Sequence, residues 1–109
     1  MICEPWSVVV VPYPFVDRRE VKRRPALVLS REDFNRAGHS ILSMVTTQAH
    51  HPWPGDVSIG DLEAAGLKVA CIVRLKLFTL DNRLVERELG QLSKADRSAV
   101  DAAVSRYLR

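Results

Sequence analysis

The sequence predicts a mainly β, α+β domain: a small, curved, mostly antiparallel sheet or barrel with short helices and a C-terminal amphipathic helix. Two observations support this class. Short apolar runs rich in β-branched residues recur along most of the chain, with proline or glycine between them. Only after Ser93 does the apolar spacing change to three or four residues. The pattern does not give the order of the strands.

The first strand is expected at 7–12, where four valines follow one another. Pro12 and Pro14 end it, because proline has no N–H to donate to a ladder. A charged loop then leads to a second strand, and the two form a hairpin with a long basic tip. The expected strands after the first are 26–30, 41–46, 56–59, 71–73, 76–80 and 84–89.

Helices are expected to be short except at the C-terminus. Residues 31–38 fit a turn or a short helix, 47–55 contain two prolines and fit a loop, and 62–67 fit one helical turn closed by Gly66. Ser93 with Asp96 three residues later resembles a capping box. The following helix is expected to pack on the sheet through one apolar face: Val100, Ala103, Val104, Tyr107 and Leu108.

Length and composition are those of one domain, which we expect to span residues 1–109. Two cysteines are too few for a disulfide framework or a zinc site, and Cys71 is expected to be a small buried apolar residue. We expect no metal and no cofactor, since no paired ligand set or phosphate-binding motif is present. No apolar run reaches the roughly 20 residues that span a bilayer, and no signal sequence leads the chain, so a cytoplasmic protein is expected.

Positive charge is concentrated between the first two expected strands. The net charge is +3, and one short segment contains five cations: Arg18, Arg19, Lys22, Arg23 and Arg24. Such a cluster attracts polyanions, nucleic acid above all. A solvated loop is the alternative interpretation of a basic run.

Polar side chains that flank the strands are the candidates for chemistry. Arg24 directly precedes Pro25, which restricts Arg24 to extended backbone and fixes where its guanidinium begins. Arg74 lies at the end of another expected strand, and Trp53 has a flat face on which a base can stack. A polar run leaves the third expected strand: Thr46, Thr47, Gln48, Ala49, His50 and His51. If the loops share one edge of the sheet, Arg24 and Thr46 face a common phosphate.

Four segments together resemble the MazF/PemK family of bacterial toxins. They are VVVVPYPFVD, KRRPALVLS, MVTTQAHHPWPGDVSI and VRLKLFTLDNRLVERELGQLS, which cover nearly the whole chain in this order. The resemblance implies a small SH3-like β-barrel that works as a homodimer, and a toxin paired with a cognate antitoxin in a type II toxin-antitoxin system. Members are typically metal-independent, sequence-selective endoribonucleases, so the implied substrate is single-stranded RNA.

By this resemblance, Arg24 and Thr46 are the catalytic pair and Arg74 is a supporting residue. Two positions depart from the family pattern. Lys76 stands where some relatives have an aspartate that is thought to act as base. Trp6-Ser7 stands where relatives commonly have Gly-Asp before the first strand.

RNA cleavage without a metal ion uses the ribose 2′-hydroxyl as nucleophile on the adjacent phosphate. Arg24 suits stabilisation of the extra negative charge, because a guanidinium is permanently charged and binds phosphate in a bidentate manner. Thr46 can hydrogen-bond the phosphate or orient the hydroxyl. His50 or His51 is a hypothesis for the proton transfers, because imidazole titrates near neutral pH. Exposed loop histidines without a role are the alternative.

Further polar residues are expected to bind the RNA: Arg18, Arg19, Lys22, Arg23, Thr47, Gln48 and Trp53. For Trp53, packing beneath the loop is an equal alternative. Two other functions remain open: a toxin of the same broad fold that binds a protein such as DNA gyrase, and an inactive RNA-binding barrel. The presence of Arg24 and Thr46 favours the nuclease, whereas Lys76 leaves room for the inactive barrel.

Overall fold

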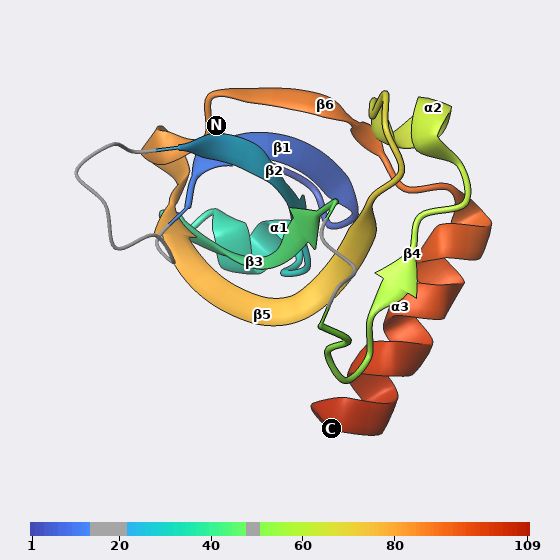
Figure 1. Cartoon of the computed structure of the whole chain (residues 1–109). Helices are drawn as coiled ribbons and strands as arrows, with labels where there is room; N and C mark the ends of the chain where they lie inside the picture. The colour runs from blue at the N-terminus through green and yellow to red at the C-terminus, as the bar shows by residue number, and fades with distance from the viewer. Residues whose placement is uncertain (14–21, 48–50) are drawn as a thin grey trace.

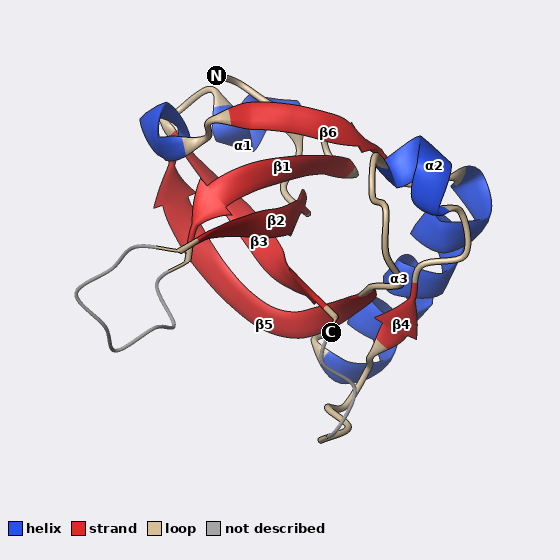
Figure 2. Cartoon of the chain, turned by 45° about the horizontal axis from the view of Figure 1, so that its top comes forward, coloured by secondary structure: helices blue, strands red, loops and turns tan. Residues whose placement is uncertain are grey.

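Six antiparallel strands form one curled sheet in the computed structural model, which describes residues 1–13, 22–47 and 51–109. The strand order is β4-β5-β3-β2-β1-β6. The bounds are Ser7–Pro12 (β1), Arg23–Val28 (β2), His39–Thr46 (β3), Val57–Ser58 (β4), Ile72–Asp81 (β5) and Arg87–Gln91 (β6). The long strand β5 bends around one side, so that the sheet curls into an open barrel (Figures 1 and 2). The predicted fold class is confirmed.

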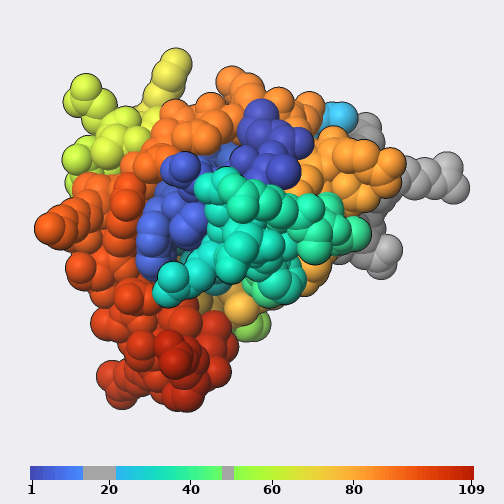
Figure 3. All heavy atoms as spheres, turned by 180° about the vertical axis from the view of Figure 1, so that it is seen from behind, coloured from blue at the N-terminus to red at the C-terminus, as the bar shows by residue number. Residues whose placement is uncertain are grey.

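The helical segments lie around this barrel. Their bounds are Glu32–Asn35 (α1), Leu62–Ala65 (α2), Asn82–Leu84 (η1, a 3₁₀ turn) and Lys94–Tyr107 (α3). Helix α1 covers one end of the barrel, and α3 runs along the outside beside β4 (Figures 1 and 2). In the view from behind, the N-terminal residues lie between α3 and the segment that contains α1 (Figure 3). None of the helices in the described part of the chain is long and apolar enough to cross a membrane.

Two apolar clusters hold the sheet from its two faces. Side chains inside the curl form the first: Cys3, Val9, Val11, Tyr13, Ala26, Val28, Leu42, Phe78, Leu80 and Val85. Side chains between the outer face and helices α2 and α3 form the second: Val8, Leu27, Val45, Ile59, Ala65, Cys71, Val73, Leu92 and Val100. Neighbouring residues of β1 and β2 alternate between the clusters, as the two-residue period of a strand requires. The burial of Cys71 confirms its predicted apolar role.

The start of α3 is joined to the chain that follows β4. Ser93 is the N-cap, and its hydroxyl accepts a hydrogen bond from the Asp96 N–H at 3.2 Å. The Asp96 carboxylate also accepts from the Gly60 and Asp61 N–H groups, at 2.9 and 3.0 Å. Ser93 thus caps the helix as expected, and Asp96 in addition ties the start of α3 to the chain that follows β4.

The apolar face predicted for α3 is covered only as far as Val104. Val100 is fully buried and Val104 packs against the outer cluster, but Tyr107 and Leu108 are each 47% exposed. The cause is visible in Figure 1, where the C-terminal end of α3 runs past the edge of the sheet.

Strand bounds differ from those expected in several places, and the strand expected at 84–89 begins only at Arg87, after the 3₁₀ turn Asn82–Leu84. β2 begins at Arg23, three residues before the expected start. Pro25 can lie inside this strand because it pairs with Val10 of β1 at a position where β1 needs no N–H from the proline. β5 is one continuous strand, and the register against β3 shifts between Ser43 and Met44 to accommodate its extra residues.

The N-terminal departure from the family pattern falls on a position with unusual backbone. Trp6 has φ of 74°, in the left-handed region that favours glycine. Its backbone is nevertheless held at both ends, since its N–H donates to the Val28 carbonyl and its carbonyl accepts from the Leu92 N–H. Hydrogen bonds and packing thus hold Trp6 in a backbone conformation that glycine would adopt without strain.

Candidate active site

Arg24 and Thr46 lie on neighbouring strands and share one face of the sheet. β2 and β3 pair in register through Ala26 and Met44, and two residues further this register sets Arg24 opposite Thr46. Arg24 shares the face of Ala26, which is inside the curl. Thr46 shares the face of Met44, which packs against the same cluster, and is 7% exposed. The two candidate catalytic residues are therefore neighbours on the concave face.

The hydroxyl of Tyr13 lies between β2 and β3 just before this pair. It accepts a hydrogen bond from the Val45 N–H at 3.0 Å and lies within donating distance of the Pro25 carbonyl and, at 2.9 Å, of the Val45 carbonyl. Pro25 has no N–H and cannot donate to β3 as another strand residue would. A side chain from the segment after β1 thus supplies the contact between the two strands at this level.

Tyr13 is a buried phenol that keeps its proton. Burial raises its pKa to about 12, although the hydrogen bond with Val45 and the charge of Arg24 act in the opposite direction. Sequence reasoning missed this residue. Its signal was a tyrosine at the end of a buried strand, where the hydroxyl needs a partner, together with a proline in the neighbouring strand.

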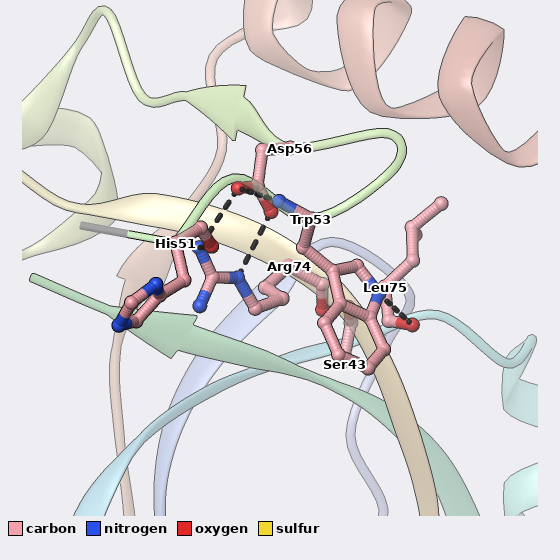
Figure 4. A network of polar contacts seen from close by, with 6 residues as sticks. All are labelled: Ser43, His51, Trp53, Asp56, Arg74 and Leu75. Carbon is pink, nitrogen blue, oxygen red and sulfur yellow. Dashed lines mark hydrogen bonds and ion pairs between the residues drawn. The ribbon is translucent and has the colours of Figure 1, made fainter. Parts of the chain in front are cut away.

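Arg74 belongs to the next strand and to the same face. It pairs with Met44 across β3 and β5, so alternation places it beside Thr46. The Ser43 hydroxyl donates a hydrogen bond to the Arg74 carbonyl and ties down its backbone (Figure 4). Arg24, Thr46 and Arg74 thus come from three adjacent strands, as expected of residues that contact one ligand.

The guanidinium of Arg74 is held by Asp56, a residue that sequence reasoning did not single out (Figure 4). Its Nε and Nη2 donate to the two carboxylate oxygens at 3.0 and 2.8 Å, and Nη2 also donates to the His51 carbonyl at 3.1 Å. The Asp56 carboxylate accepts a further hydrogen bond from the backbone N–H of Trp53 at 3.0 Å. The hydrogen bonds from Arg74 hold the pKa of Asp56 below its ordinary value, while Asp56 raises the pKa of Arg74, so both stay charged at neutral pH.

Trp53 is anchored but remains accessible. Its indole N–H donates to the Leu75 carbonyl at 3.1 Å, and the residue as a whole is 39% exposed. The Lys76 ammonium lies 5.4 Å from the centre of the ring, within the range of a cation–π contact. The packing alternative therefore describes one part of the indole, and stacking of a base on the rest stays a prediction.

The other predicted RNA-binding residues differ in their surroundings. Lys22, Thr47 and His51 are exposed. Arg23 is exposed too, and its Nε lies 2.6 Å from Oε2 of Glu86. Because side chains alternate along a strand, Arg23 points to the opposite side of β2 from Arg24. Four predicted residues lie outside the described part of the chain: Arg18, Arg19, Gln48 and His50.

A hollow of about 510 Å³ opens beside the start of β2, next to residues that alternate with the inward-facing Arg24 and Ala26. Its lining contains cations, one carboxylate and apolar side chains: Val10, Arg23, Arg24, Pro25, Glu86, Arg87 and Leu89. Arg23 and Glu86, which form an ion pair, both belong to this lining. Within residues 1–13, 22–47 and 51–109, no three His, Cys, Asp or Glu side chains are grouped as metal ligands would be.

Comparison with known families gives one match that covers almost the whole chain. Residues 4–108 match the model of the family described as PemK-like, MazF-like toxin of type II toxin-antitoxin systems. No curated protein sequence matches the chain.

Solved structures with similar folds are MazF toxins and endoribonucleases. A MazE–MazF complex from Deinococcus radiodurans is 23% identical, with a TM-score of 0.77 over 99% of this chain and 97% of that one. An endoribonuclease in complex with its cognate antitoxin from a mycobacterial species is 18% identical, with a TM-score of 0.78 over 97% and 94%. The Mycobacterium tuberculosis toxin MazF-mt6 is 19% identical, with a TM-score of 0.74 over 92% and 93%. At these identities the likeness concerns the fold.

Proposed function

Because the chain belongs to the PemK-like, MazF-like toxins of type II toxin-antitoxin systems, we propose that it is a metal-independent endoribonuclease that cuts single-stranded RNA at selected sequences. The observation that carries this proposal is the register of β2 and β3, which, continued two residues past Ala26 and Met44, sets Arg24 opposite Thr46 on the concave face. A toxin that acts by binding a protein has no need for this pair.

The proposed reaction is attack of a ribose 2′-hydroxyl on the adjacent phosphorus, with departure of the 5′-oxygen of the next nucleotide. Arg24 offers the phosphoryl oxygens a fixed positive charge, which counts most as their negative charge increases in the transition state. Thr46 hydrogen-bonds a phosphoryl oxygen or orients the hydroxyl. Arg74, fixed by Asp56, supports the phosphate from the neighbouring strand. The products are a 2′,3′-cyclic phosphate and a 5′-hydroxyl.

The rest of the proposal follows from the family and the distribution of charge. Exposed cations near the start of β2 bind the RNA backbone, and Trp53 stacks on an unpaired base. The chain works as a homodimer in the cytoplasm, as one domain over 1–109, and binds a cognate antitoxin. An endoribonuclease of similar fold from a mycobacterial species forms a complex with its cognate antitoxin, and MazF from Deinococcus radiodurans forms one with MazE.

Incubation of the purified protein with a mixed-sequence RNA in EDTA tests the activity. Wild type is expected to give discrete fragments that end in 2′,3′-cyclic phosphate, and mapping of the ends gives the recognition sequence. Arg24→Ala and Thr46→Ala are expected to lower cleavage at least about 100-fold, in the range found for loss of one transition-state donor. Arg36→Ala and Thr79→Ala are the matched controls, because both side chains are exposed and lie away from the pair.

Two results would contradict the proposal. Intact RNA after incubation with wild type excludes the nuclease and leads to a search for a protein target such as gyrase. Salt-sensitive RNA binding without fragments indicates instead an inactive RNA-binding barrel.

A further inference from the structure

Tyr13 occupies the place of a strand-to-strand hydrogen bond at the level where Arg24 and Thr46 begin. We propose that Tyr13 is a positioning residue, whose hydroxyl bridges Pro25 and Val45 and thereby sets the width of the gap between Arg24 and Thr46 in which the scissile phosphate is held. The proposal rests on the nuclease function proposed above and adds a residue to its machinery.

The bridge replaces one direct hydrogen bond by two in series. Pairing of β2 with β3 in register ends at Ala26 and Met44, and the next residues along, Pro25 and Val45, are joined through the phenol instead. A direct N–H···O bond spans about 2.9 Å, whereas two bonds through one oxygen span up to about 5–6 Å. The strands are therefore held further apart here than an unbroken ladder would hold them.

This extra width matters because the catalytic pair faces across it. In a closed antiparallel ladder, directly opposite side chains have Cβ atoms about 4.5–5.5 Å apart. A phosphoryl group that accepts a hydrogen bond from each side needs about 2.7–3.0 Å to each donor. A bridge that widens the gap, and fixes it, leaves room for the phosphate between Arg24 and Thr46.

The rest of Tyr13 is held firmly enough to serve as a spacer. Its N–H donates to the Lys22 carbonyl at 3.2 Å, which continues the β1–β2 pairing by one residue. Its ring meets Phe78 edge to face, with centroids 5.7 Å apart at 63°. At 6% exposure the phenol is covered by the inner cluster, so it acts through Arg24 and Thr46 and does not itself move a proton of the substrate.

The test compares Tyr13→Phe, which removes the oxygen and keeps the ring, with Ser40→Ala as a control. The Ser40 hydroxyl donates to Asn82 Oδ1 at 2.6 Å in the buried first part of β3, so its loss also costs a buried hydrogen bond but leaves the gap intact. Both are assayed on an RNA oligonucleotide that carries the mapped cut site, at a temperature where circular dichroism shows each variant folded. Exchange of the Val45 amide hydrogen is followed by NMR in parallel.

Tyr13→Phe is expected to lower kcat at least about tenfold with KM changed less than about twofold, since misplaced catalytic groups cost rate more than binding. Ser40→Ala is expected to keep the wild-type kcat, and only Tyr13→Phe should speed Val45 exchange. The proposal is overturned if Tyr13→Phe cleaves with the wild-type kcat, if Ser40→Ala loses as much, or if Val45 exchange is unchanged. Intact RNA with wild type overturns the nuclease function itself, and Val45 exchange then still decides whether the phenol bridges the strands.

Discussion

Removal of the Asp56 charge should destabilise the fold far more than removal of a surface charge. Asp56→Asn keeps the shape of the side chain but leaves one acceptor oxygen where the carboxylate has two, so one of the two bonds from Arg74 is lost and the other is weakened. The Trp53 N–H loses a charged acceptor as well. The change therefore acts on three hydrogen bonds of one half-buried network.

The burial of the pair sets the expected magnitude. The Arg74 and Asp56 side chains are only 11% and 20% exposed. Exposed ion pairs contribute about 0.2–1 kcal/mol, whereas breaking a fully buried one costs about 3–5 kcal/mol. We expect Asp56→Asn to lower the free energy of unfolding by about 2–3 kcal/mol, the range of a hydrogen bond to a charged group.

Urea unfolding followed by circular dichroism measures this loss. With a slope of about 1–3 kcal/mol per molar urea, the midpoint should fall by about 0.7–3 M. Glu32→Gln is the control, because its pair with Arg36 is 42–64% exposed and should contribute about 0.3–0.5 kcal/mol. A midpoint for Asp56→Asn no lower than that of Glu32→Gln would refute the estimate.

The difference in stability between wild type and Asp56→Asn should depend on pH, in a direction that follows from the lowered pKa of Asp56. The pKa of Asp56 is lower in the folded than in the unfolded chain, chiefly because of its hydrogen bonds from Arg74. The stabilisation is thus complete above the unfolded value of about 3.9 and is lost as pH falls through the folded pKa. The difference between wild type and Asp56→Asn should be constant from pH 7 to pH 5 and shrink toward pH 3, and a constant difference would contradict this assignment.

Two further predictions concern stability and use the same unfolding assay. The Ser7 hydroxyl is fully buried and has no partner among the described residues, so Ser7→Ala should raise the free energy of unfolding by about 1 kcal/mol; equal or lower stability would show that the hydroxyl is satisfied. Burial alone would raise the pKa of Asp96, but hydrogen bonds from the Asp61 and Gly60 N–H groups and from Ser93 outweigh burial and lower it. Asp96→Asn should therefore lower the free energy of unfolding by about 2 kcal/mol at pH 7 and by much less at pH 3. A loss of stability that is the same at both pH values would show that the negative charge of Asp96 does not contribute to its hydrogen bonds with the two N–H groups.

Local sequence patterns were enough to predict most strands and the last helix. The continuous valines of β1 and the spacing after Ser93 depend on near neighbours only, and both elements form as expected. The ends of β2 could not be predicted in this way. Whether a proline can lie inside a strand depends on which neighbour its missing N–H would face, and that is a property of the sheet order.

The candidate site was predicted in part for the same reason. Arg24 and Thr46 were singled out by their chain context, at a proline and at the end of a strand, and the resemblance to the MazF/PemK family made them the predicted catalytic pair. Tyr13 and Asp56 were missed because their roles depend on partners far along the chain: Tyr13 binds Val45, and Asp56 binds Arg74. Such pairings become visible only when the sheet brings the strands together.

The hydrogen bonds around Arg74 also show whether Asp56 could act as the base, since Lys76 stands where some relatives have an aspartate in that role. Asp56 is a carboxylate beside the site, but its bonds to Arg74 hold its pKa low, and a carboxylate with a low pKa has little tendency to take a proton from a 2′-hydroxyl. Asp56 is therefore suited to orient Arg74 and poorly suited to replace the aspartate that some relatives have in place of Lys76. If the chain cuts RNA, stabilisation of phosphoryl charge by Arg24, and the distance at which Thr46 faces it, contribute to the rate whichever group moves the protons. That contribution is what gives the bridge of Tyr13 its importance, because a charge stabilises a transition state only as well as it is placed.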